Sequence, residues 1–188
     1  MKPSPMIVAA LLALSACRED VAEIPGPIPM TEEALGFYCQ MALGEHGGPK
    51  GQVHLAGVPA PLFFSQVRDA IAYTRMPEQT DEVVAIYVSD MSRAPGWQEP
   101  GKDNWVAASD AFFVVGSDAV GGMGAKEIVP FSVRADADGF AALHGGRVVR
   151  LSDIPDSAVL APAGGDDAGD DEDDYLDRLK ATENAEDR

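Results

Sequence analysis

The chain has few cysteines, few basic residues and no long apolar run, and each shortage argues against a class of protein. Two cysteines among 188 residues, Cys17 and Cys39, cannot make a disulfide scaffold. The chain has 14 Lys and Arg residues and 31 Asp and Glu residues, which gives a net charge of -17. This balance argues against a nucleic-acid partner, because phosphate binding needs a basic surface. Every apolar run is shorter than the roughly 18 residues that a membrane-spanning helix needs.

The composition, with 46% hydrophobic residues, is typical of a globular protein. The N-terminal residues have the pattern of a bacterial export signal. A basic residue, Lys2, precedes an apolar stretch over residues 6–14. Because Leu14-Ser15-Ala16-Cys17 also resembles a lipobox, we expect residues 1–16 to be a signal peptide and Cys17 to carry lipid. Acyl chains there would anchor the protein to a bacterial membrane. The alternative is an ordinary cleaved signal that leaves Cys17 as a free thiol.

Two segments flank the part of the chain that is expected to fold. Residues 17–31 are acidic and rich in proline, which predicts a tether. Residues 164–188 carry a dense block of acidic residues and few aromatic ones. Such a segment cannot bury enough apolar surface to offset the entropy of ordering, so a disordered acidic tail is expected.

A strand, helix, strand order occurs twice between these flanks. In the first half, residues 52–55 and the β-branched run at 83–88 are predicted to be strands. Between them, residues 64–75 have a helical pattern, for which Ser65 is a suitable N-cap. The first half therefore predicts one helix between two strands.

The second half repeats this order. An apolar run predicts a strand at residues 112–115, and residues 147–151 predict another. The helix between them is expected over 133–143, with Ser132 as its N-cap and Gly145-Gly146 after its end.

The repetition predicts an α+β fold of two similar small lobes, each a few strands with one helix packed on one face. The first lobe is expected over residues 32–93 and the second over 94–163. The turn-rich stretch from 94 to 104 would join them.

A thiol and a thioether lie two residues apart in Phe37-Tyr38-Cys39-Gln40-Met41. In extended backbone, alternate side chains point to one side, so that Cys39 and Met41 would converge. Thiolate and thioether together form a soft site, which suits Cu(I) better than magnesium, calcium or manganese. Met123 offers a third sulfur, because a methionine within Gly121-Gly122-Met123-Gly124 is easier to explain as a ligand than as packing. These three residues are the candidate ligands.

Each candidate ligand also has a structural interpretation. A single cysteine is usually a small buried hydrophobe, and a methionine often fills a core. His46 follows Met41 closely enough to be a nitrogen ligand, but a histidine in a turn of glycine and proline is more often solvated. Zinc fits less well than copper, because closed zinc sites want four Cys or His ligands. The sequence offers one free cysteine, Cys39, and three scattered histidines.

The sequence carries no arrangement typical of a common enzyme. It has no Ser, His and acid set in a nucleophile elbow, no Walker loop and no H-E-x-x-H motif. The chain is therefore not expected to be an enzyme.

The chain resembles the NosL family, the lipoprotein copper chaperones of nitrous oxide reductase maturation. The resemblance rests on the lipobox at Cys17, the motif at residues 38–41, the segment 45–52 and the stretch from 116 to 131. It implies a periplasmic carrier that binds Cu(I) and hands it toward the copper clusters of nitrous oxide reductase. The partner that it implies is a membrane ABC-type complex of the same assembly system. It also implies a two-lobed fold similar to the organomercurial lyase accessory fold.

Under this resemblance, Cys39 and Met41 fall on the family's C-x-M pair, and Met123 falls on its later methionine. Some relatives have a second cysteine in a C-x-x-C-G-M arrangement. Here Gly36 takes the place of that cysteine, and Gln40 replaces the glycine. The departure leaves a single thiolate and makes the thioether ligands more important.

Two other functions stand beside the copper chaperone. The first is a metal-free lipoprotein that recruits basic partners through its acidic surface and tail. The second is an organomercury-cleaving enzyme, which only fold analogy suggests and which needs a second positioned thiol that is missing. A chaperone binds Cu(I), whereas the interaction module does not.

Overall fold

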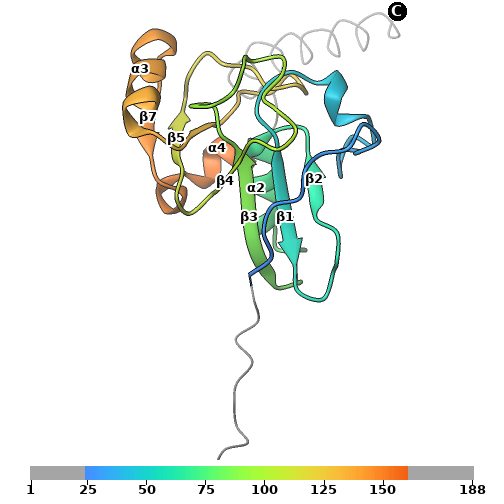
Figure 1. Cartoon of the computed structure of the whole chain (residues 1–188). Helices are drawn as coiled ribbons and strands as arrows, with labels where there is room; N and C mark the ends of the chain where they lie inside the picture. Colours follow the sequence, from blue (N-terminus) through green and yellow to red (C-terminus); the bar gives the residue numbers. More distant parts are fainter. Residues whose placement is uncertain (1–23, 161–188) are drawn as a thin grey trace, which may run out of the picture.

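The computed structural model describes residues 24–160, which form two antiparallel sheets with helices packed against them (Figure 1). The predicted signal peptide, the lipid site at Cys17 and the acidic tail at 164–188 lie outside the described residues. No helix within the described part of the chain is long and apolar enough to cross a membrane.

The first sheet has four strands in the order β2-β1-β3-β4. These are β1 (Gly51–Leu55), β2 (Leu62–Phe64), β3 (Val83–Ser89) and β4 (Trp105–Ala107). The predicted strands at 52–55 and 83–88 are confirmed as β1 and β3. Strands β2 and β4 are three residues each, too short to give a periodic pattern in the sequence.

Helix α2 (Val67–Arg75) packs against this sheet. The predicted start at residue 64 is wrong, because Phe64 pairs with Gly51 in the sheet. Ser65 is not the N-cap either: Gln66 occupies that position and makes no side-chain capping bond. A Cβ on Gly51 would clash with the Cβ of Ala70, so the glycine lets the helix lie directly on β1.

The second sheet has three strands in the order β6-β5-β7. These are β5 (Phe112–Val115), β6 (Val129–Phe131) and β7 (Arg147–Val149). The predicted strand at 147–151 is shorter than expected, because Leu151 begins a 3-10 helix, η2 (Leu151–Asp153).

Helix α3 (Arg134–His144) covers the outer side of the second sheet and is the orange helix at the edge of the molecule in Figure 1. Its N-cap is Val133, without a side-chain capping bond, so the prediction of Ser132 as the cap is wrong. The backbone N–H of Ser132 instead donates to Asp90 Oδ1 at 2.8 Å. Gly145, at φ 74°, ends the helix as predicted.

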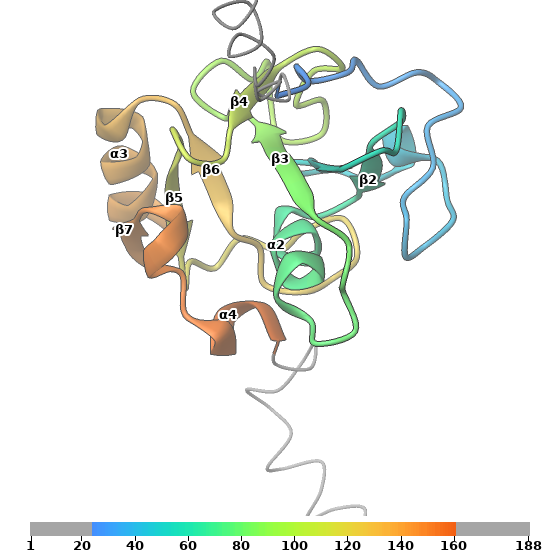
Figure 2. The same cartoon turned by 90° about the horizontal axis from the view of Figure 1, so that it is seen from below.

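One hydrophobic core joins the two sheets. Its buried side chains include Val67 of α2, Val88 of β3 and Phe113 of β5. Helix α4 (Asp156–Leu160), which follows the second sheet, packs against α2, and Figure 2 shows the two helices side by side. The α+β class with two sheets is confirmed, but residue 94 does not divide them, because β4 pairs with β3.

The chain before the first sheet is also folded onto it. Within the segment expected to be a tether, the Ile28 N–H donates to Gln52 Oε1 at 2.9 Å, and Gln52 Nε2 donates to the Ile28 carbonyl at 3.1 Å. Met30 is buried in a cluster with Leu43, the first residue of the 3-10 helix η1 (Leu43–Glu45), and Trp105. Residues 28–30 therefore belong to the folded body.

Candidate functional site

The segment that holds Cys39 and Met41 is a tight turn. The N–H of Gly36 donates to the Met41 carbonyl at 3.0 Å, and the N–H of Gln40 donates to the Gly36 carbonyl at 2.8 Å. The expectation of an extended backbone is therefore wrong, and the alternation of side chains along a strand does not relate Cys39 to Met41. The turn brings the chain at residue 41 back beside residue 36.

Aromatic side chains fix this turn against β2 and α2. The Phe37 ring lies 5.7 Å from that of Phe64 and 5.4 Å from that of Tyr73, between ring centroids. The Tyr38 ring lies 5.4 Å from Phe64 in an edge-on geometry. The Phe37 N–H also donates to the Phe63 carbonyl at 2.7 Å. The loop before Cys39 is thus packed on the first sheet.

Gly36 and Gln40, the two positions that differ from the C-x-x-C-G-M arrangement, both affect this turn. Gln40, which replaces a glycine, has φ 55°, in the left-handed region that glycine adopts without strain. Its side-chain Nε2 donates to the Phe37 carbonyl at 2.7 Å, which helps to hold that conformation. A Cβ on Gly36 would lie 2.5 Å from Cys39 Sγ, so the glycine leaves room for the thiol.

Cys39 is a free, half-buried cysteine. Its Sγ lies 3.4 Å from the Ser65 hydroxyl oxygen, in the connection between β2 and α2. The buried Lys50 ammonium lies within electrostatic range of this thiol. Burial lowers the Lys50 pKa to about 8, while the negative charges of Glu127 and Cys39 act in the opposite direction. A negative charge at Cys39 would therefore favour the positively charged form of Lys50.

Lys50 ties the chain after the Cys39 turn to the same connection. Its Nζ donates to the carbonyls of His46 and Gly48 at 2.7 Å each, and to the carbonyl of Gly47 at 3.1 Å. A further bond of 3.3 Å reaches the Ser65 carbonyl. One buried ammonium thus holds residues 46–48 beside Ser65.

The loop that carries Met123 approaches from the second lobe and is closely packed. The Met123 N–H donates to Gln66 Oε1 at 2.7 Å. A Cβ on Gly121 would lie 2.6 Å from Glu127 Oε2, and one on Gly122 would lie 2.5 Å from the His46 Cβ. The glycines before Met123 therefore permit close contact on two sides.

Consecutive residues contact the Cys39 thiol and the backbone of Met123. Ser65 contacts the Cys39 thiol, and Gln66 binds the backbone of Met123. Met41 and Met123 are 41% and 42% exposed, so both thioethers are open to a partner or to an incoming ion. The structure brings Cys39 and Met123 to one connection, and their role as ligands stays a prediction.

His46 lies next to this pair and fits a nitrogen ligand. Its Nδ1 donates to the Gly122 carbonyl at 3.1 Å, which leaves the Nε2 lone pair of the neutral ring available. Among residues 24–160, no hydrogen-bond partner is found for this buried Nε2. Histidines that bind metals commonly donate their other ring N–H in this way.

A site built from acidic, cysteine and histidine side chains alone finds no support. Within the described residues, no group of three or more His, Cys, Asp or Glu side chains is arranged to hold a metal ion.

The other two histidines contact polar side chains of the fold. His54 is buried, with its Nε2 2.9 Å from Gln52 Oε1. His144 Nδ1 lies 2.9 Å from Asp118 Oδ1 at the end of α3.

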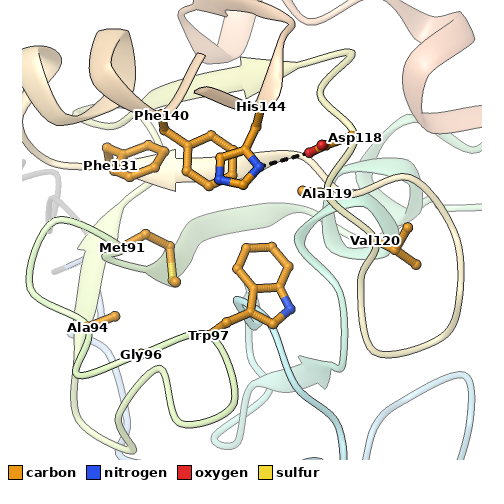
Figure 3. Close-up of a pocket in the computed structure, with 10 residues that line it drawn as sticks. All are labelled: Met91, Ala94, Gly96, Trp97, Asp118, Ala119, Val120, Phe131, Phe140 and His144. Atoms are coloured by element: carbon orange, nitrogen blue, oxygen red, sulfur yellow. Dashed lines mark hydrogen bonds and ion pairs between the residues drawn. The ribbon is translucent and has the colours of Figure 1, made fainter. Parts of the chain in front are cut away.

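A cavity of about 620 Å³ lies in the second lobe. Figure 3 shows Met91, Trp97 and Phe140 around it, with the Asp118–His144 pair at its edge. Neither Cys39, Met41 nor Met123 lines it. It is mostly apolar and does not contribute to the cluster at Ser65 and Gln66.

Sequence reasoning did not single out Lys50, Gln66 or Glu127. All three are buried, although each is polar or charged. Glu127 precedes the apolar run Ile128-Val129-Pro130-Phe131, and a carboxyl in such a position is a signal of a buried acid. Its Oε1 accepts bonds from the N–H groups of Arg68 and Ile128, at 3.0 and 2.8 Å. Burial raises the pKa of Glu127 to about 8.

Comparison with known proteins identifies similar chains. The NosL family matches residues 27–159. A protein named copper-binding lipoprotein NosL from Achromobacter cycloclastes is 56% identical over 179 residues, covering 94% of this chain and 92% of the relative. Another of that name from Stutzerimonas stutzeri is 33% identical over 162 residues, covering 84% and 82%.

A solved structure has a similar fold. The crystal structure of the copper chaperone NosL from Shewanella denitrificans aligns with a TM-score of 0.64 at 32% sequence identity. The alignment covers 69% of this chain and 95% of that one.

The buried Glu127 predicts a dependence of stability on pH. Its carboxyl keeps a proton up to about pH 8 in the folded chain, whereas the ordinary value is 4.5. The folded state therefore binds an additional proton between these values, and the free energy of unfolding falls as the pH rises through them. Urea unfolding between about pH 5 and 7.5 should show a smaller loss for Glu127→Gln than for wild type. Equal losses in the two proteins would contradict a buried neutral carboxyl.

Proposed function

Because the chain belongs to the NosL family, we propose that it is a copper chaperone that binds Cu(I) through Cys39, Met41 and Met123. The proposal rests mainly on two contacts at consecutive residues. Ser65 contacts the Cys39 thiol, and Gln66 accepts a hydrogen bond from the Met123 backbone. The names of its relatives as copper-binding proteins and a copper chaperone support the metal and the non-enzymatic role.

The donor set selects the oxidation state of the ion. A Cys39 thiolate supplies negative charge and most of the affinity, and the two thioethers are neutral soft donors that favour Cu(I) over Cu(II). His46 can add a nitrogen donor, because its Nε2 is free of hydrogen bonds among the described residues. The nearby Lys50 ammonium offsets the charge of a thiolate without donating to copper.

Exposure of the thioethers explains how copper could leave the site. Met41 and Met123 are each about two-fifths exposed, whereas the Cys39 turn is packed on the sheet. An incoming methionine or histidine of a partner can replace one thioether while the thiolate still holds the ion. The site then binds copper tightly and exchanges it by ligand substitution.

The recipient and the location are further parts of the proposal, and membership of the family supports them. We propose that the chain is lipid-anchored at Cys17, lies in the periplasm and delivers Cu(I) for the copper centres of nitrous oxide reductase. Its partner would be a membrane ABC-type complex of that assembly system. The names of the relatives as lipoproteins support the anchor. Mass spectrometry that finds a mature Cys17 without acyl groups would contradict it.

The copper site is tested by anaerobic titration of the mature chain in detergent with Cu(I) and a competing chelator. Cys39→Ser should weaken binding by about a hundredfold or more, because even the residues that only orient metal ligands contribute about 10–100-fold. Met91→Leu, which changes a half-buried methionine at the cavity in the second lobe, is the control and should leave the affinity unchanged. Wild-type affinity in Cys39→Ser, or no binding by wild type, would refute the site and favour the metal-free interaction module.

Delivery is tested in the producing bacterium. Replacing the chromosomal copy with Cys39→Ser should yield nitrous oxide reductase with reduced copper content, measured on the purified enzyme. Because the variant keeps its predicted lipid site and its surface charge, a fully loaded enzyme in that strain would contradict delivery through this site.

A further inference from the structure

We infer that Gln66 is a positioning residue that places the Met123 thioether for copper and thereby couples the two lobes at the site. The inference rests on the proposed function and deepens it, since Gln66 has no soft donor atom of its own. Gln66 lies between strand β2 and helix α2, and the sequence alone assigned it no role.

The first support is the bond from the Met123 backbone. The Met123 N–H donates to Gln66 Oε1 at 2.7 Å, across 57 residues of sequence and from one lobe to the other. Gln66 itself is 0% exposed, so its side chain is enclosed by protein. A buried acceptor fixes the backbone of the residue whose thioether is exposed.

The second support is the packing of the loop on the Gln66 side chain. A Cβ on Gly121 would lie 2.9 Å from Gln66 Cδ and 3.0 Å from Cγ. The loop therefore rests directly on this side chain, two residues before Met123. The hydrogen bond and the close contact thus both join the loop to the Gln66 side chain.

The third support is the neighbour of Gln66 in the sequence. Ser65 contacts the Cys39 thiol at 3.4 Å and accepts a bond from Lys50 through its carbonyl. Consecutive residues thus set the positions of the thiolate donor and of the thioether donor. Gln66 is the residue of this connection that bonds directly to the Met123 backbone, so that a change in its side chain acts on Met123 first.

The chemistry of Gln66 also allows a clean test. Its Nε2 is buried and has no hydrogen-bond partner among the residues that the structure describes. Leucine in its place therefore removes one unpaired donor together with the acceptor, which limits the penalty to the fold. The change acts mainly on the Met123 N–H, which loses its partner.

The experiment is a double-mutant cycle on the full mature chain in detergent, with Gln66→Leu, Met123→Leu and the double variant. Cu(I) affinity is measured by chelator competition. If Gln66 acts through Met123, Gln66→Leu weakens binding by about tenfold, as loss of a group that orients a ligand commonly does. The double variant is then no weaker than Met123→Leu. Additive losses would indicate a general structural effect and overturn the inference.

Gln52→Leu is the matched control. Gln52 is also 0% exposed, and its Oε1 likewise accepts a backbone N–H, from Ile28 at 2.9 Å. It should keep wild-type copper affinity, and a loss equal to that of Gln66→Leu would overturn the inference. If Gln66→Leu fails to fold, as judged by circular dichroism, Gln66→Asn keeps the amide but withdraws the oxygen by one methylene and should show the same loss.

The outcomes separate the inference from the function on which it rests. Wild type that binds no Cu(I) refutes the copper site itself. Wild type that binds Cu(I) through Cys39, with unchanged affinity in both Gln66 variants, leaves the copper site standing and overturns only the role of Gln66.

Discussion

The candidate site depends on the connection between β2 and α2, where two neighbouring residues face the two lobes. Ser65 contacts the thiol of the first lobe and Gln66 binds the loop of the second. The connection is rigid, because Phe64 before it is paired in the sheet and α2 after it is packed on β1 through Gly51. The common core between the sheets then keeps both lobes in one arrangement. The connection therefore contacts two segments, at Cys39 and at Met123, that are 84 residues apart in the sequence.

Buried polar groups around this connection give the site its electrostatic character. Lys50 and Glu127 are both buried, and burial shifts each toward its neutral form. Lys50 is compensated by four carbonyls, whereas Glu127 Oε2 has no hydrogen-bond partner within residues 24–160. At neutral pH, which lies below both pKa values, Glu127 is mainly protonated and Lys50 mainly carries its positive charge.

Patterns of local sequence predicted much of the fold, and contacts between distant segments explain the rest. The β-branched run of β3 and the glycines after α3 predicted those elements because they act locally. Strands β2 and β4 were not predicted, because three residues are too few to show the alternation of a strand. Their pairing partners are also distant in the sequence. Ser65 and Ser132 were wrongly expected to be N-caps, because each helix begins one residue later and the N-caps are Gln66 and Val133. Residue type indicated Cys39, Met41 and Met123, whereas Gln66 could be found only from the bond that it makes across the two lobes.

X-ray absorption at the copper edge tests the central claim most directly, because it reports the atoms bound to the metal. The account predicts that the Cu(I)-loaded wild-type chain has a first shell dominated by sulfur, and that Met123→Leu loses sulfur from it. A first shell of nitrogen and oxygen alone, or a sulfur shell that Met123→Leu leaves unchanged, would contradict a site shared between the two lobes.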